Sequence, residues 1–253
     1  MKITGNTILI TGGGSGIGRG LAAAFHTLGN KVVIAGRREG VLREAVAASP
    51  GMEYLVFDQG SPDGVRGLAT QAQERFPKLN VLINNAGIQR VEDLTSGEIA
   101  DAEATIDTNL LGPIRMTAAL IRQLMSQPQS AILNVSSALA MMPAAMMPSY
   151  CASKAAIHSY TQSLRFQLRN SSVQVIEIVP PWVQTELQGE RGMNPRAMPL
   201  NEYISETMAV LKNSPEVTEV VIDRAKPMRF AERGDFDASF NKYNEGWAVS
   251  QHR

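Results

Sequence analysis

The sequence predicts a doubly wound α/β fold, a Rossmann-like arrangement in which helices cover both faces of a parallel sheet in three layers. Short runs rich in β-branched residues alternate with longer segments of helical periodicity. The strand-like runs are apolar almost throughout, as expected for strands buried on both faces. The first of them leads directly into a glycine-rich turn and a helix-like segment.

The predicted strands are six short runs, at 7–11, 31–35, 53–57, 80–84, 131–135 and 173–179. The segments between them are long enough for one crossover helix each, at 16–28, 39–48, 62–76, 98–126 and 150–169. Helical periodicity returns once more at 201–213. Because ligands of such folds bind at the carboxyl ends of the strands, we expect the functional residues in the segments that follow them.

Length and composition favour one domain over residues 1–253 with a small-molecule partner. The 24 basic residues balance 24 acidic ones, so neither nucleic acid nor an anionic membrane surface is an expected partner. One cysteine and three histidines make a zinc site implausible, and we predict no metal. No apolar stretch approaches the roughly 20 residues of a membrane span, and the early first strand leaves no room for a signal peptide, so we expect a cytoplasmic protein.

The glycine-rich turn has the sequence "TGGGSGIG", from Thr11 to Gly18. Its glycines would let the backbone turn tightly and approach a pyrophosphate at the N-terminus of the following helix, although a tight turn alone would also explain them. In this position the pattern T-G-x-x-x-G-x-G resembles the short-chain dehydrogenase/reductase family. The resemblance extends over roughly residues 5 to 185. It implies an enzyme that interconverts a ketone or aldehyde and an alcohol with a nicotinamide cofactor.

A tyrosine and a lysine, Tyr150 and Lys154, stand four residues apart on a predicted helix, on one face and about 6 Å apart along its axis. A nearby ammonium favours the phenolate and lowers the pKa of the phenol toward the range where it can exchange protons. Taken alone, such a pair is more often an interfacial tyrosine beside a solvated lysine. In the family pattern the tyrosine protonates the carbonyl oxygen, and the lysine also binds the nicotinamide ribose.

Two further residues match the catalytic set of the family. Ser137 precedes Tyr150 by thirteen residues, and in the family such a serine contacts the same carbonyl oxygen. Ser136 fits less well because strand alternation turns it to the other side. Asn109 matches the asparagine that holds a water on the proton path to the lysine. Its alternative role is that of a mid-helix residue bonded to backbone.

The end of the second strand predicts a preference for NADP(H) over NAD(H). Members of the family that prefer NAD usually carry an acid where Gly36 stands, and here Arg37 and Arg38 follow it. A guanidinium can pair with the 2′-phosphate of NADP. The alternative is that these arginines begin an exposed helix, which would leave an NAD-dependent dehydrogenase open.

The remaining cofactor contacts are implied by the resemblance alone. Asp58 matches the residue that meets the adenine amino group, although it could instead cap the following helix. The motif "NNAG" at 84–87 matches the family's chain segment beside the cofactor, and it could also hold strand ends together. The full set of implied cofactor-binding residues is Gly12, Gly14, Ser15, Gly16, Ile17, Gly18, Arg37, Arg38, Asp58, Asn85, Ala86, Gly87, Tyr150, Lys154, Pro180, Val183 and Thr185.

The chain departs from the family pattern after the sixth strand. In "PPWVQT", Pro181 replaces the family's glycine and predicts a different or stiffer local path into a substrate lid at about 181–213. Residues 214–244 suggest helical material broken near Pro227 in place of a seventh strand. An ordinary family tetramer is therefore doubtful, which leaves a homodimer or a monomer.

Substrate selection is expected to depend on the segment between Ser137 and Tyr150 and on the lid. Four methionines there, with Trp182, could line a site for an irregular apolar group, or they could be core residues. These methionines are Met141, Met142, Met146 and Met147.

The predicted function is thus that of an NADP-dependent carbonyl reductase of the short-chain dehydrogenase type, with Tyr150 as general acid/base. A non-catalytic NADP-binding regulatory protein is the alternative from another class. An epimerase or dehydratase fits less well, because the extended relatives usually need a larger C-terminal substrate domain.

Overall fold

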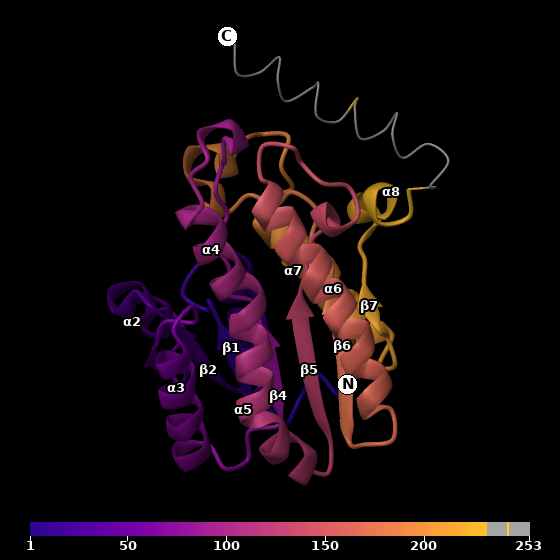
Figure 1. Cartoon of the computed structure of the whole chain (residues 1–253). Coiled ribbons are helices and arrows are strands. Elements are labelled where there is room, and N and C mark those ends of the chain that lie inside the picture. The colour runs from indigo at the N-terminus through magenta and orange to yellow at the C-terminus, as the bar shows by residue number, and fades with distance from the viewer. Residues whose placement is uncertain (232–241, 243–253) are drawn as a thin grey trace.

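Seven parallel strands form one sheet in the order β3-β2-β1-β4-β5-β6-β7 (Figure 1). The structure is a computed structural model and describes residues 1–231 and residue 242. The strands are β1 (Thr7–Thr11), β2 (Lys31–Gly36), β3 (Glu53–Val56), β4 (Val81–Asn84), β5 (Ser130–Val135), β6 (Val173–Ile178) and β7 (Glu219–Val220). The six predicted strands are confirmed, and with them the predicted fold class.

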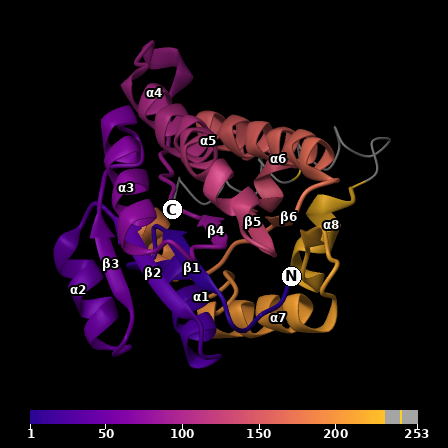
Figure 2. The same cartoon turned by 90° about the horizontal axis from the view of Figure 1, so that it is seen from below.

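Helices cover both faces of this sheet, as the view along the strands shows (Figure 2). The longer helices are α1 (Gly16–Thr27), α2 (Glu39–Ala47), α3 (Pro62–Arg75), α4 (Ala100–Ile106), α5 (Gly112–Ser126), α6 (Pro148–Leu168) and α7 (Leu200–Asn213). The shorter helical segments are η1 (Leu94–Ser96), η2 (Asp107–Leu111), η3 (Ala138–Ala140), η4 (Glu186–Met193), η5 (Asp223–Ala225) and α8 (Lys226–Arg229).

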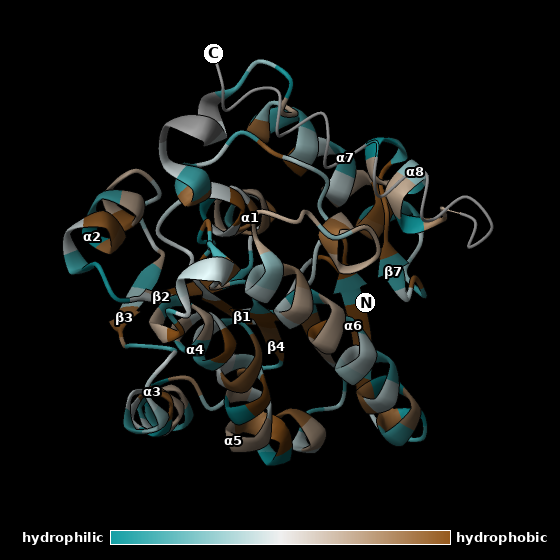
Figure 3. Cartoon of the chain, turned by 45° about the horizontal axis from the view of Figure 1, so that its top comes forward, coloured by the Kyte–Doolittle hydropathy of each residue, from teal (hydrophilic) through white to brown (hydrophobic). Residues whose placement is uncertain are grey.

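Alternation along each strand fills one core on each face of the sheet. In β1, Ile8 and Ile10 pack into the cluster that includes Phe25 of α1 and Tyr203 of α7. Leu9, between them, packs into the opposite cluster with residues of α3 and α5. Figure 3 shows brown strands in the middle of the molecule, surrounded by helices that carry both teal and brown residues. Burial on both faces explains why the strands are apolar almost throughout.

The sequence predicted one helix over 98–126, and the structure corrects this. The π-helical turn η2 separates α4 from α5. Pro113 has no N–H, so the carbonyl of Asn109 four residues earlier loses its helical donor. The N–H of Gly112 instead bonds the carbonyl of Asp107, five residues back. Asn109 is therefore held in a widened, buried turn.

The prediction of helical material over residues 214–244 is wrong for Glu219–Val220, which form β7 beside β6. Val220 and Ile222 bury their β-branched side chains in the core, which accounts for the strand. Residues 223–229 are helical, in η5 and α8. The remaining part of the prediction, 232–241 and 243–244, lies outside the described residues. Because a seventh strand exists, the inference against a family tetramer loses its basis.

Candidate active site at the carboxyl ends of the strands

A pocket of about 490 Å³ lies at the carboxyl ends of the strands, where the strand order reverses between β1 and β4. Its walls include the predicted site residues Gly12, Gly14, Ser15, Gly16, Ile17, Arg37, Arg38, Asp58, Asn85, Ala86, Gly87, Ser137, Tyr150, Lys154, Pro180, Val183 and Thr185. Gly18 and Asn109 are buried and do not line it. The fold therefore brings together segments that are far apart in the sequence.

The glycine turn depends on the absence of side chains at two kinds of position. Gly12 and Gly16 have positive φ angles of 66° and 50°, which favour glycine. A Cβ at Gly18 would come within 2.3 Å of the carbonyl oxygen of Gly12. Gly18 thus lets α1 pack closely on the turn, and its contribution to the pocket is indirect.

The N-terminus of α1 lines the pocket, and no side chain of the helix start occupies its free N–H groups. Its N-cap residue, Ser15, makes no side-chain hydrogen bond to the helix, and the first turn contains no acidic residue. The unsatisfied N–H groups and the helix dipole therefore favour an anion at this end of the pocket.

Hydrogen bonds join the motif at 84–87, which begins at the end of β4, to the start of the glycine turn after β1. The hydroxyl of Thr11 accepts hydrogen bonds from the backbone N–H groups of Asn85 (3.1 Å) and Ala86 (3.0 Å). The side-chain amide of Asn85 donates to the carbonyls of Thr11 (3.0 Å) and Gly12 (3.3 Å). Asn85 thus holds strand ends together, which was the second role considered for this motif, while it also lines the pocket.

Two arginines stand at the pocket end formed by β2. Arg38 donates to the hydroxyl of Ser15 at 3.2 Å and lies 3.9 Å from the carboxylate of Glu186. Arg37 is exposed, lines the pocket, and has no ion pair with any described residue. Its guanidinium is therefore available to a ligand. Asp58 accepts from the N–H of Gly60 and does not cap α3, because Ser61 is the N-cap.

The opposite end of the pocket holds Ser137 and Tyr150, whose side chains both line it. Burial raises the pKa of Tyr150 well above its usual value of 10, and this outweighs the nearby hydroxyl of Ser137, which lowers it. Tyr150 is therefore protonated at neutral pH and can donate that proton. The hydroxyl of Ser136 donates to the carbonyl of Ile178 instead, at 3.3 Å.

Lys154 lies beneath this pair on the next turn of α6. Its ammonium donates to the carbonyl of Val135 at 2.7 Å and lies 5.6 Å from the centre of the Tyr150 ring. Burial lowers the pKa of Lys154 to about 8, and the negative charge of Glu177 opposes that shift. At neutral pH the side chain is still protonated. The expected lowering of the Tyr150 pKa by this ammonium is not found: burial raises that pKa, and Lys154 is not among the groups that shift it.

The side chain of Asn109, in the widened turn η2, forms hydrogen bonds with backbone groups of Ile88. Its carboxamide donates to the carbonyl of Ile88 and accepts from the N–H of the same residue, both at 2.8 Å. It also donates to the hydroxyl of Ser153 at 3.2 Å, which in turn donates to the carbonyl of Tyr150. Asn109 thereby ties the segment after β4 to α6.

The substrate side of the pocket includes residues that sequence reasoning missed. The missed lining residues are Gln89, Arg90 and Met228, whereas Leu139 and Gln188 lie in the two segments that were expected to select the substrate. Of the four methionines considered above, only Met147 is among the described residues that line the pocket, and Trp182 also lines it. No sequence signal pointed to Met228, because α8 reaches the pocket only through the path of the chain after β7.

The segment after Pro181 is tied at its base by a short backbone bridge. Trp182 accepts from the N–H of Met198, whose carbonyl accepts from Gln184, both at 2.8 Å. Pro181 thus precedes a fixed stretch of backbone, and the segment from Glu186 to Gln188 extends from it over the pocket.

Comparisons with known proteins show which family the chain resembles. The family model described as short chain dehydrogenase matches residues 6–195. The uncharacterized oxidoreductase DltE of Bacillus subtilis (strain 168) is 40% identical over 250 residues, which cover 96% of this chain and 98% of that protein. Dehydrogenase/reductase SDR family member 7B of Bos taurus is 30% identical over 71% of this chain and 58% of its own length.

Solved structures show the same architecture. A short chain dehydrogenase from Burkholderia cenocepacia J2315 in complex with NADP has a TM-score of 0.80 at 27% identity, covering 95% of this chain and 99% of that one. A short chain dehydrogenase/reductase from Burkholderia phymatum in complex with NAD has the same fold, with a TM-score of 0.83 at 23% identity, covering 94% of this chain and 96% of that one.

None of the helices in the described part of the chain combines the length and the apolar content that crossing a bilayer requires.

Proposed function

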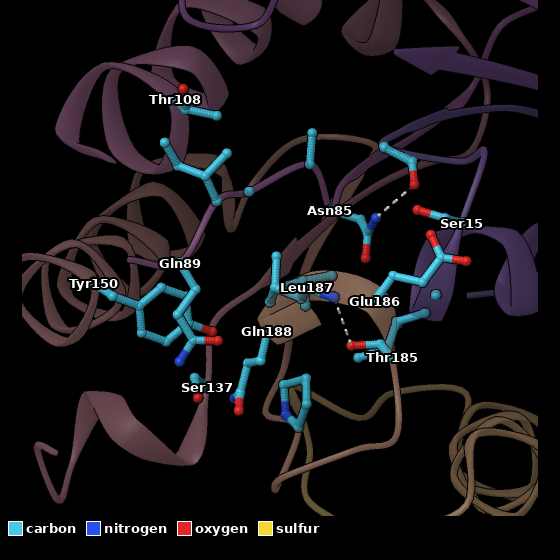
Figure 4. Close-up of a pocket in the computed structure, with 18 of the residues that line it drawn as sticks. Ser15, Asn85, Gln89, Thr108, Ser137, Tyr150, Thr185, Glu186, Leu187 and Gln188 are labelled. Atoms are coloured by element: carbon cyan, nitrogen blue, oxygen red, sulfur yellow. Dashed lines mark hydrogen bonds between the residues drawn. The ribbon is translucent and has the colours of Figure 1, made fainter. Parts of the chain in front are cut away.

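Because the chain belongs to the short-chain dehydrogenase/reductase family of NAD(P)-dependent oxidoreductases, we propose that it reduces a ketone or aldehyde with NADPH, using Tyr150 as the proton donor. The observation that carries this proposal is the pocket that begins at the uncapped N-terminus of α1 and ends at the side chains of Ser137 and Tyr150. Figure 4 shows Ser15 and Asn85 at one side of the pocket and Tyr150 and Ser137 at the other.

The residues present fit a nicotinamide dinucleotide. The free N–H groups of α1 and the turn around Gly12 suit a pyrophosphate, while Arg37 and Arg38 suit the 2′-phosphate that distinguishes NADP. When bound, this cofactor supplies the hydride of the reaction. Lys154, which lines the pocket with Gly87 and Tyr150, would hold the nicotinamide ribose.

Each polar group at the reacting end then has a distinct task. Ser137 would donate a hydrogen bond to the carbonyl oxygen of the substrate, and Tyr150 would transfer its proton to that oxygen. The ammonium of Lys154 would stabilise the phenolate that remains. Asn109 holds the segment around Ile88 against α6 and so keeps the pocket wall in place.

The experiment that tests the proposal is a panel of ketones, aldehydes and alcohols assayed with NADPH, NADH and their oxidised forms. We expect NADPH oxidation, followed by the loss of its absorbance near 340 nm, with at least one carbonyl. A purified protein that binds NADPH but turns over none of the panel would favour a regulatory protein instead.

The substitution Arg37→Asp is expected to reverse the preference for NADPH. Arg37 lines the pocket and has no ion pair with a described residue, so its charge is free to bind a phosphate. Losing one charge-assisted contact and gaining a repulsion should lower the ratio of kcat/KM for NADPH to that for NADH by about 10- to 100-fold. The measurement is that ratio, with one carbonyl substrate held at a saturating concentration.

Arg122→Asp is the matched control, because Arg122 is an exposed arginine of α5 outside the pocket. It makes the same change in net charge and should leave the ratio unaltered. If Arg37→Asp retains the ratio of the parent, Arg37 does not recognise the 2′-phosphate.

A further inference from the structure

Gln89 places a carboxamide in the wall of the pocket, close to the reacting end. The side chain lines the pocket, and the residue is only 9% exposed. Its position is fixed, because Asn109 binds both backbone groups of the preceding residue, Ile88, at 2.8 Å. Three residues later, the N–H of Glu92 bonds the carbonyl of Met146. A carboxamide in this place is therefore built into the structure.

The hydrogen bonds of this carboxamide are poor for so buried a group. Its N–H group donates to the sulfur of Met147 at 2.7 Å, and a thioether is a weak acceptor. No other described residue gives it a hydrogen bond. A primary amide carries two donors and an acceptor oxygen, and the oxygen of Gln89 is not among the fully buried atoms that lack a partner, so its free hydrogen-bonding capacity faces the pocket. A stronger partner is therefore expected from a bound molecule.

A second carboxamide reaches the same end of the pocket from η4. Gln188 lines the pocket, and its side chain has no hydrogen-bond partner among the described residues. Figure 4 shows Gln89 and Gln188 on the same side of the pocket as Tyr150 and Ser137, away from Ser15. Two neutral amides thus stand beside the group that would protonate the substrate.

Resting on the proposed function, we propose that Gln89, with Gln188, binds a neutral hydrogen-bonding group of the substrate next to its reacting carbonyl. The substrate is then a ketone or aldehyde that carries a hydroxyl or ester on a neighbouring carbon. The nearby cation, Arg90, lies 3.7 Å from the carboxylate of Asp101, which partly neutralises its charge, whereas the two carboxamides are neutral. Leu139 and Met228 line the pocket with apolar surface for the rest of the molecule.

Two pairs of ketones of equal chain length test this specificity. In the first pair, 1-hydroxy-2-hexanone carries a hydroxyl where 3-heptanone has a methyl group. In the second, ethyl acetoacetate carries an ester where 2-heptanone has methylene groups. Gln89→Leu should lower kcat/KM for at least one polar ketone by about tenfold or more, and should change the plain ketones less than about twofold. Gln89→Met, a second apolar replacement, should behave alike and excludes a packing defect peculiar to leucine.

The control variant is Gln71→Leu, because Gln71 is an exposed glutamine of α3 outside the pocket. This change should leave kcat/KM unaltered for both ketones of each pair. If both Gln89 variants lower kcat/KM equally for the polar and the plain ketone of each pair, the recognition role is overturned while the reductase function stands. If the parent reduces none of the four ketones or any other carbonyl of the panel, the proposed function fails, and the role of Gln89 with it.

Discussion

Replacing Tyr150 by phenylalanine should lower kcat for carbonyl reduction by about a thousandfold and leave NADPH binding largely intact. Tyr150 is buried at the end of the pocket and keeps its proton, because burial raises the pKa of its phenol. A positioned general acid contributes about 10²- to 10⁴-fold to such reactions. Phenylalanine retains the ring and its packing but has no proton to transfer. The measurements are kcat at saturating NADPH and the affinity for NADPH from its fluorescence.

Tyr160→Phe on the same helix is the matched control. Tyr160 also loses a hydroxyl in this change, but its side chain does not line the pocket. Its kcat should remain within about twofold of the parent. A Tyr150→Phe variant with more than about a tenth of the parental kcat would show that another group donates the proton, and Ser137 would then be the first to replace.

The fold could be predicted because its signals are local. Apolar runs bounded by helical segments identify the strands, and the glycine turn after β1 identifies the place where the strand order reverses. The residues nearest to the reacting atoms follow from the spacing of Ser137, Tyr150 and Lys154 within the family pattern. The structure brings these three into one pocket wall.

The features that could not be predicted from the sequence depend on contacts between segments that are distant in the sequence. The turn η2 depends on Pro113, but the position of its Asn109 depends on Ile88, which no local pattern indicates. The strand β7 is two residues long and forms only because β6 offers an edge. Met228 reaches the pocket from α8 beyond that strand.

A charge cluster around the buried Glu177 was also beyond prediction from apolar periodicity. Glu177 is fully buried on β6, and its carboxylate lies 2.8 Å from the imidazole of His158. Glu219 stands opposite it on β7, where two like charges would repel. Arg229 compensates by binding both carboxylate oxygens of Glu219 at 2.9 Å. The charge of Glu177 also favours the protonated form of Lys154, one helical turn before His158.

The buried ammonium of Lys154 should serve activity at the expense of stability. Burial lowers the pKa of Lys154 from 10.5 to about 8, a difference that corresponds to about 3 kcal/mol against folding at neutral pH. Removing the hydrogen bond to the carbonyl of Val135 would cost about 1 kcal/mol. Lys154→Met is therefore expected to raise the free energy of unfolding by about 2 kcal/mol at pH 7, while kcat falls by about 10²-fold or more.

The dependence of this gain on pH separates the charge from packing. Below about pH 8 the lysine is protonated in the folded and the unfolded chain, and the penalty is complete. Between about pH 8 and 10.5 the unfolded chain binds more protons at this residue, so the parent gains stability as the pH rises. At pH 9.5 the penalty is about 1 kcal/mol, and parent and variant should be almost equally stable.

Urea unfolding without cofactor at pH 7 and 9.5 measures the free energy of unfolding of parent and variant. Lys212→Met, an exposed lysine of α7, should change stability by less than about 0.5 kcal/mol at either pH. A methionine variant less stable than the parent at pH 7 would show that the ammonium of Lys154 stabilises the fold.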